Sequence, residues 1–247
     1  MLDHTELNGI WQLRAVAEFS RDIREEPWDA PGWLTQELPA HWQEHPALIH
    51  HSGKVVYRRR VRVKPVPERR TFLRFSGIFY RYSAYLNGHL LGQGEGYFAP
   101  AEFEVTGRLT GDDLIVLEVD CPREERKLGK RLITGIFSHW DHLDPKLEPG
   151  GVWLPVELVY SGTAKIDRLG VETRRFDPQS AKVRLTLDVD AAALADPLLV
   201  VTFTPANFPG EPQTFKFRTQ LKPGANRITQ ECAVERYRLW WPHDLGE

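Results

Sequence analysis

The sequence has few sulfur-containing residues and no long apolar run. Its 247 residues include one methionine and two cysteines, Cys121 and Cys232, which lie far apart and belong to no metal-binding or redox motif. Isolated cysteines of this kind favour reduced thiols in an intracellular protein. No stretch approaches the ~18 consecutive apolar residues of a membrane-spanning helix, and the first residues lack the basic start and apolar core of a signal peptide. We therefore expect a cytoplasmic protein without membrane contact.

The sequence also lacks an excess of charge of either sign. The formal net charge is −2 and the isoelectric point is about 6.5, so no general electrostatic attraction to nucleic acid or to an anionic membrane is expected. The most basic segment is Val55–Val63, where alternation puts Arg58, Arg60 and Arg62 on one side of a strand. We interpret that side as a solvated face. Arg59 falls on the apolar side and would need a carboxylate partner if it were buried.

Helical periodicity is absent, and short alternating segments take its place. Tyr80–Leu86 and Leu114–Val119 read as strands. Asn87-Gly88 follows the first of them and predicts a tight hairpin, because both residues of such a turn need positive φ. Short strands separated by turns at this spacing are typical of an all-β sandwich or barrel, which is the fold class that we predict.

The best domain junction is the small polar stretch Ser161-Gly162-Thr163, which divides the chain into residues 1–162 and 163–247. The second part has five strand candidates, separated by turn residues: 166–173, 181–189, 198–204, 214–219 and 226–234. An immunoglobulin-like sandwich has about seven strands in about 100 residues. The shortage predicts a second sandwich that lacks its last strand.

The chain is rich in tryptophan, with eight residues, and several of them lie outside the strand patterns: Trp28, Trp33, Trp42 and Trp140. A tryptophan pairs an apolar face with a polar edge, which suits sugar rings as well as the packing of loops onto sheets. Both interpretations stay open for each of these residues.

A series of short motifs resembles glycoside hydrolase family 2, the group of β-galactosidases, β-mannosidases and β-glucuronidases. The motifs occur in the family's order at Leu7–Trp11, Leu38–Trp42, Phe75–Ile78, Ala84–Gly92, Gly96–Pro100, Gly150–Leu158 and Tyr237–Glu247. One departure is Leu154, where the family usually has an arginine.

The resemblance implies a jelly-roll sugar-binding domain at 1–162 and an immunoglobulin-like β-sandwich at 163–247, truncated before its last strand. In the family a TIM barrel follows and carries the two catalytic glutamates, one of them in an Asn-Glu segment. This sequence contains no Asn-Glu pair, so the resemblance predicts no catalytic residue here. The implied function is that of the N-terminal, non-catalytic part of a retaining exo-β-glycosidase.

The partners implied by the resemblance are a terminal β-linked sugar, the protein's own C-terminal TIM barrel and further copies of the chain in a homo-oligomer. A different class of function stays open, that of a stand-alone carbohydrate-binding or partner-binding β-sandwich protein with no hydrolase activity. The sequence does not decide which sugar is recognised, although Trp140-Asp141 favours the mannosidase type slightly.

Phe137–Pro145 is the candidate functional segment, because it resembles the family loop that reaches the terminal sugar. By that match Asp141 accepts hydrogen bonds from sugar hydroxyls, Trp140 packs on the ring, and His139 and His142 add polar contacts. His139, Asp141, His142 and Asp144 could also be read as metal ligands, but no cysteine or helix sets their geometry. We expect no metal and no cofactor. Neither a phosphate loop nor a hydrolase triad is indicated, because Gly92–Gly96 opens no helix and no Gly-x-Ser-x-Gly turn occurs.

Overall fold

The chain folds into two compact units, Met1–Tyr160 and Ser161–Glu247, in a computed structural model that describes residues 3–121 and 149–241. Strands account for 58% of the described residues and helices for 5%, so the prediction of an all-β protein is confirmed. None of the helices among the described residues is long and apolar enough to cross a membrane.

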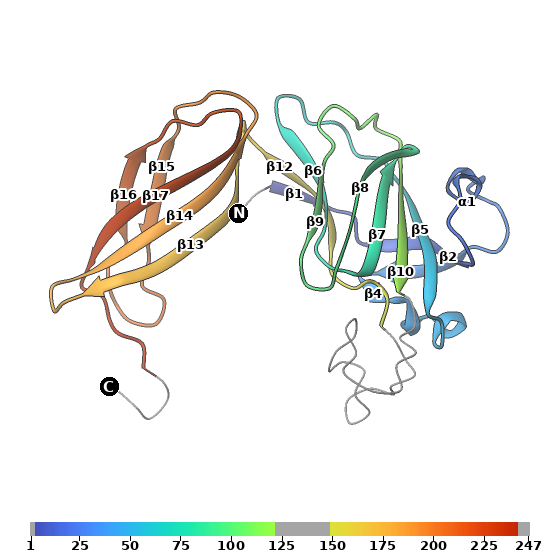
Figure 1. The fold of residues 1–247 in the computed structure, drawn as a ribbon, viewed down its shortest axis with the longest axis horizontal. Coiled ribbons are helices and arrows are strands. Elements are labelled where there is room, and N and C mark those ends of the chain that lie inside the picture. Colours follow the sequence, from blue (N-terminus) through green and yellow to red (C-terminus); the bar gives the residue numbers. More distant parts are fainter. Residues whose placement is uncertain (1–2, 122–148, 242–247) are drawn as a thin grey trace. The chain divides into compact units, whose positions relative to one another are not determined.

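The first unit consists of two antiparallel sheets (Figure 1). One has the strand order β1-β12-β6-β9, and the other has the order β3-β2-β5-β10-β7-β11-β4, with β8 paired to β7. The bounds are β1 Asp3–Glu6, β2 Gly9–Val16, β3 Leu34–Leu38, β4 Ala40–His41, β5 Gly53–Val61, β6 Arg70–Phe75, β7 Ile78–Leu86, β8 His89–Gly96, β9 Ala101–Glu104, β10 Asp113–Cys121, β11 Gly151–Val152 and β12 Val156–Ser161. A short helix α1, Arg21–Glu25, and two 3-10 turns, Trp42–Glu44 and Pro46–Leu48, lie between strands.

The core of the first unit lies between its two sheets. The strands β2, β5, β10 and β12 contribute alternate side chains to it, as the period of two requires. The largest of the fully buried apolar side chains are Trp11, Tyr57, Phe75, Phe79 and Trp42. The predicted hairpin is also present: Asn87 and Gly88 have φ of 50° and 77°, and they connect β7 to β8.

The basic side of β5 differs from its prediction, because Arg58 is completely buried. The segment 17–33, which includes α1, covers this side of the sheet, and Arg58 lies under two of its tryptophans. The guanidinium carbon of Arg58 is 3.8 Å from the ring centroid of Trp33 and 5.1 Å from that of Trp28. The prediction of a solvated face therefore holds for Arg60 and Arg62, which are exposed, and is wrong for Arg58.

The buried guanidinium of Arg58 is satisfied by oxygen atoms of the covering segment. It donates to the carbonyl oxygens of Glu26, Pro27 and Trp28 at 2.7 to 3.0 Å, and to Oε1 of Gln12 at 2.7 Å. Arg59 is bound in a similar way, since its Nη1 donates to the carbonyl oxygens of Leu7 and Asn8. The expected carboxylate partner of Arg59 is thus replaced by backbone carbonyls.

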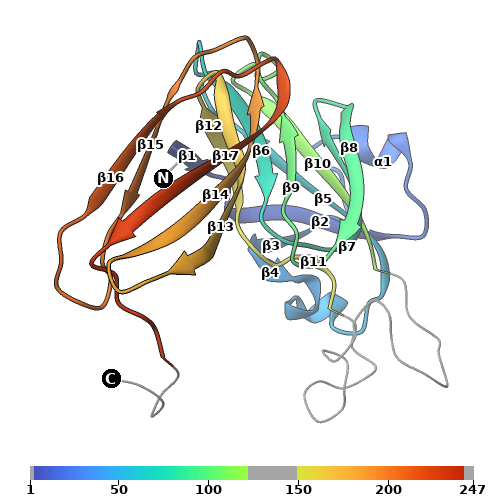
Figure 2. The ribbon, with the colours of Figure 1, turned by 60° about the vertical axis from the view of Figure 1, so that its left-hand side comes forward.

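The second unit has a three-stranded sheet of order β13-β14-β17 and a two-stranded sheet of β15 and β16 (Figure 2). All five strands predicted for this half occur. Their bounds are β13 Ala164–Phe176, β14 Ser180–Ala191, β15 Leu198–Phe203, β16 Gln213–Arg218 and β17 Gly224–Glu235. The core of this unit is built on β14, where the alternate residues Val183, Leu185, Leu187 and Val189 are buried.

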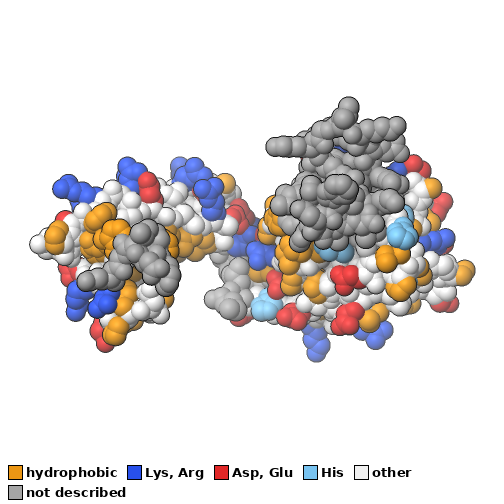
Figure 3. All heavy atoms as spheres, turned by 90° about the horizontal axis from the view of Figure 1, so that it is seen from below, with side chains coloured by type: hydrophobic (Ala, Val, Ile, Leu, Met, Phe, Trp, Pro, Cys, Tyr) orange, Lys and Arg blue, Asp and Glu red, His pale blue; other side chains and the backbone are white. Residues whose placement is uncertain are grey.

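One strand of the second unit is open on its core side. Leu169 pairs with Leu187 and Val171 pairs with Leu185, so these side chains share the core face of the sheet. Leu169 and Val171 are nevertheless 57% and 59% exposed, and Ile166, opposite buried Val189, is 52% exposed. Figure 3 shows that hydrophobic side chains reach the surface of this unit. Two strands in the second sheet are thus too few to cover β13.

We predict that Arg58→Met lowers the free energy of unfolding of the first unit by about 3 kcal/mol, because three carbonyls and one amide oxygen lose their donor. Chemical denaturation measures this loss, and limited proteolysis should cut faster within residues 17–33. The control is Arg60→Met at an exposed position of the same strand, for which a change within about 0.5 kcal/mol is expected. Equal stability of the two variants would contradict the role of Arg58.

Candidate functional site

The four residues that the sequence indicates as the sugar-contacting group are His139, Trp140, Asp141 and His142, and all four lie outside the described residues. The described chain stops at Cys121, the last residue of β10, and resumes at Pro149. The thiol of Cys121 donates to the carbonyl oxygen of Pro149 at 3.5 Å. The two described residues that flank the segment 122–148 are therefore in contact.

The two glycines after Pro149 are fixed against the 3-10 turn that begins at Trp42. The backbone N–H of Trp42 donates to the carbonyl oxygen of Gly150 at 2.9 Å, and the N–H of Gly150 donates to Oε1 of Gln43 at 3.1 Å. Gly151 begins β11 and pairs with His41 of β4 and Phe79 of β7. These bonds set the position at which the chain leaves the segment 122–148.

Only glycine fits at positions 150 and 151. A Cβ atom on Gly150 would lie 2.1 Å from Cζ2 of buried Trp42, far inside van der Waals contact. Gly151 has φ of +114°, which other residues rarely adopt, and its Cβ would lie 2.5 Å from the hydroxyl oxygen of Tyr57. The Gly-Gly pair of the sequence motif is thus explained by close packing.

A group of four rings, which we call the aromatic platform, lies next to this anchor and consists of His41, Tyr97, Phe98 and Trp153. The ring of Trp153 stacks on His41, with centroids 6.0 Å apart and planes 3° apart, and on Tyr97 at 4.9 Å. Phe98 meets the ring of Tyr97 edge-on at 4.4 Å. The indole N–H of Trp153 donates to the carbonyl oxygen of Tyr97 at 3.1 Å, which fixes the stack.

The side chains of the platform are suited to binding a ligand. Phe98 is 62% exposed, and the other three rings are partly buried, so the platform presents aromatic faces and edges to a ligand. Within residues 3–121 and 149–241, no group of three or more His, Cys, Asp or Glu side chains could hold a metal ion. The platform can therefore hold an apolar ring face, and it supplies no acid-base pair.

Burial controls the ionisation of the platform. Desolvation lowers the pKa of His41 below its ordinary value, although the Gly150 carbonyl and Glu44 act in the opposite direction. Burial also raises the pKa of Tyr97. The neutral forms of both rings are thus favoured near pH 7.

The sequence identified the motifs that contain these rings, but it did not predict that the rings lie next to one another. His41 lies in Leu38–Trp42, Tyr97 and Phe98 lie in Gly96–Pro100, and Trp153 lies in Gly150–Leu158. They converge because β11 pairs with both β4 and β7, and because β8, which ends at Gly96, pairs with β7. No local pattern encodes that pairing.

We predict that Gly150→Ala destabilises the first unit by about 2 kcal/mol or more, since Trp42 and the backbone must shift to admit the methyl group. Thermal denaturation measures the shift in Tm. Gly96→Ala is the matched control, because a Cβ at Gly96 meets no atom within 4 Å. A Gly150→Ala protein as stable as the control would refute the close packing.

A second prediction concerns pH. The lowered pKa of His41 means that the unfolded chain binds a proton more readily than the folded one, so stability should fall as pH decreases through about 6.5, the ordinary histidine value. The fall ends below the lowered pKa of folded His41. His41→Gln should flatten the profile of Tm against pH. An unaltered profile in His41→Gln would disprove this linkage.

Comparison with known proteins finds matches among solved structures but none by sequence. Neither the protein-family models nor the curated proteins contain a match. Among solved structures, the chain is similar to the β-D-mannosidase of Dictyoglomus thermophilum, with a TM-score of 0.74, 21% identity, and coverage of 100% of this chain and 33% of the other. For the β-glucuronidase of Bifidobacterium dentium in complex with coumarin-3-O-glucuronide, the values are 0.73, 22%, 96% and 43%.

A third similar structure is a β-glucuronidase from glycoside hydrolase family 2, with a TM-score of 0.72, 17% identity, and coverage of 96% of this chain and 27% of the other. Identities this low establish the fold and no more. The chain spans less than half the length of each of these three glycosidases, and it has the fold of the part that it matches.

Proposed function

We propose that this chain is the N-terminal, non-catalytic part of a retaining exo-β-glycosidase of glycoside hydrolase family 2. The observation that carries the proposal is the similarity of fold over 96% to 100% of this chain to glycosidases in which the matched part is 27% to 43% of the length. The order of the sequence motifs supports the same family. The catalytic residues would then lie in a TIM barrel outside these 247 residues.

The proposal assigns a different domain type to each of the two parts of the chain. Residues 1–162 form a jelly-roll sugar-binding domain, which is supported by the two facing antiparallel sheets of the first unit. Residues 163–247 form an immunoglobulin-like sandwich, which is supported by the division of five antiparallel strands between two sheets.

The second sandwich lacks its last strand. The exposure of Ile166, Leu169 and Val171 on the core face of β13 supports this part of the proposal, because the buried partners of these residues on β14 mark that face as interior. A further strand beside β15 or β16 would cover it. Such a strand would follow residue 247 in a longer protein.

The role of the chain is to help bind the terminal sugar and to support the barrel. Asp141 accepts hydrogen bonds from sugar hydroxyls, Trp140 packs on the ring, and His139 and His142 add polar contacts. The anchor at Gly150 and the stacked platform support this role, since they fix the point at which the chain returns from the segment 122–148. A buried, hydrogen-bonded attachment point of this kind holds a binding segment in place.

The proposed setting is the cytoplasm. Both Cys121 and Cys232 are buried thiols outside any disulfide bond, which supports a reducing compartment. Assembly of the intact protein into a homo-oligomer is part of the same proposal, with the β-domains as contacts.

We predict that the 247-residue chain alone does not hydrolyse chromogenic β-galactosides, β-mannosides or β-glucuronides, and that the protein extended beyond Glu247 hydrolyses one of them with retention. Activity of the short chain that a point mutation within it abolishes would overturn the proposal. So would an extended protein without activity on any β-glycoside.

In the extended protein, Asp141→Asn should lower kcat/KM by about a hundredfold, because a charge-assisted hydrogen bond to the sugar is lost. Asp144→Asn, three residues later in the same segment, is the matched control and should retain near-normal kinetics. Equal effects of the two substitutions would show that Asp141 has no special contact with the sugar.

A further inference from the structure

The side of β7, β8 and β10 that faces away from the core carries a hollow of about 490 Å³. Its lining includes six polar side chains, which we call the polar grid: Arg81, Ser83, Gln93, Glu95, Glu118 and Asp120. Phe19, from the segment that precedes α1, contributes an aromatic ring to the same lining. Small-molecule sites commonly have volumes of about 300 to 1,000 Å³, so the hollow is large enough for a ligand.

The polar grid is regular because its members are direct cross-strand neighbours. Arg81 of β7 lies opposite Glu95 of β8 on one side and opposite Asp120 of β10 on the other. Ser83 lies in the same way between Gln93 and Glu118. Adjacent strands are about 4.8 Å apart, and alternate residues along a strand are about 6.7 Å apart. The polar groups therefore form two rows of three, over an area that suits one or two sugar rings.

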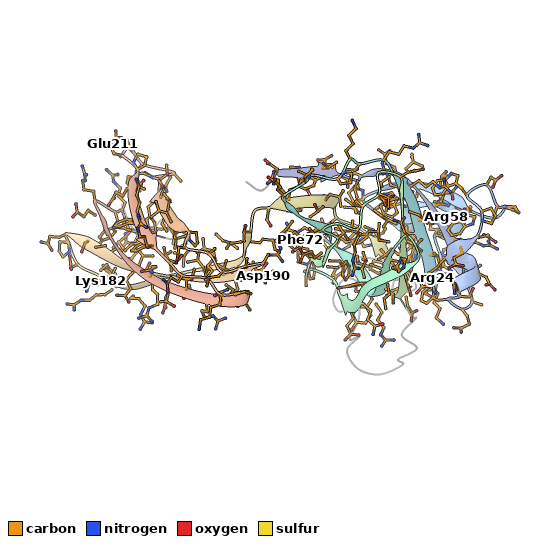
Figure 4. The ribbon with its side chains drawn as sticks, turned by 90° about the horizontal axis from the view of Figure 1, so that it is seen from above. Arg24, Arg58, Phe72, Lys182, Asp190 and Glu211 are labelled. Carbon is orange, nitrogen blue, oxygen red and sulfur yellow. The ribbon has the colours of Figure 1, made fainter. Side chains whose placement is uncertain are left out.

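One member of the grid is held rigidly. The side chain of Glu118 is 5% exposed, and its carboxylate accepts from Nη1 of Arg24 at 2.6 Å and from the hydroxyl of Tyr85 at 3.1 Å. The guanidinium of Arg24 also lies over the ring of Tyr85 at 4.4 Å. Figure 4 labels both Arg24 and Arg58 on the first unit. This part of the lining is preorganised, and its charge is balanced by Arg24.

Other members are available to a ligand. Within the described part of the chain, Asp120 and Gln93 have no hydrogen bond from their side chains. Arg81 and Glu95 are 3.5 Å apart, with side chains 55% and 60% exposed, which makes a weak pair that a ligand can redirect. The grid thus offers two carboxylates as acceptors, one guanidinium as donor, and an amide that does both.

This combination selects a neutral ligand rich in hydroxyl groups. A hydroxyl donates to a carboxylate and accepts from a guanidinium or amide, and the apolar face of a sugar ring can pack on Phe19. The grid has one arginine and three carboxylates. Arg24 balances Glu118, and Lys54, opposite Asp120 on β5, is paired with Glu18, so the remaining charge is negative and disfavours an anionic ligand.

We propose that the polar grid is a binding site for a neutral saccharide, formed by the folded first unit without any residue of the segment 122–148. The choice of a saccharide among hydroxyl-rich ligands rests on the proposed function. The existence of a binding site is inferred from the arrangement of the grid residues. The site would hold part of a longer glycan, or a glycan to which the protein attaches.

The test is ligand-observed NMR on the 247-residue chain, with cellobiose, lactose and β-1,4-mannobiose as neutral probes and glucuronic acid as the anionic comparison. At least one neutral probe should bind with a Kd below about 10 mM, and glucuronic acid should bind more weakly. Asp120→Ala and Gln93→Ala should each weaken binding about tenfold or more. Arg62→Ala is the control, because Arg62 is an exposed residue outside the grid, and it should bind as the unaltered chain does.

Three results would overturn the inference: no binding of any neutral probe, binding that survives both grid substitutions, or tighter binding of glucuronic acid. The proposed function would fail separately. A chain that binds neutral sugars through the grid while the extended protein hydrolyses no glycoside would support the inference alone. An active extended protein whose first 247 residues bind none of the probes would refute the inference alone.

Discussion

The close approach of Gly150 and Gly151 to Trp42 and Tyr57 is the constraint on which the candidate site depends. The backbone there lies so near the indole of Trp42 that no side chain fits at position 150, and the positive φ of Gly151 turns the chain into β11. That strand in turn joins β4 to β7 and brings Trp153 onto His41 and Tyr97. Without this packing, the return of the chain from the segment 122–148 and the aromatic platform would both lose their positions.

The two units differ in how far the faces of their strands are covered. In the first unit the side of β5 that faces away from the core is covered at Arg58, and the buried cation of Arg58 is satisfied by carbonyls and by the rings of Trp28 and Trp33. In the second unit the apolar side chains of Leu169 and Val171 point to the core side and remain exposed. An uncovered apolar strand favours association with another segment. Among the described residues, the first unit thus covers its buried cation, whereas the second leaves apolar side chains on a core face exposed.

The sequence predicted what depends on local order along the chain. Alternation gave the strands of the second unit, and Asn87-Gly88 gave the hairpin, because both are decided by neighbouring residues. The burial of Arg58 was missed, since alternation tells which side of a strand a residue is on and not whether a distant segment covers that side. Trp28 and Trp33, two large rings in a segment without strand pattern, were the available signal. The meeting of His41, Tyr97 and Trp153 could not be predicted from spacing, because strand pairing between distant segments brings it about. Asp141 and its three neighbours lie outside the described residues, so their role stays a prediction.

The measurement that tests the central claim most directly is the sequence of the native reading frame beyond Glu247. The account predicts about 300 or more further residues, enough for one strand that completes the second sandwich and for a TIM barrel of about 250 residues with an Asn-Glu segment and a second glutamate. A stop codon directly after Glu247 would contradict it, because the family's catalytic pair would then have no place in the protein.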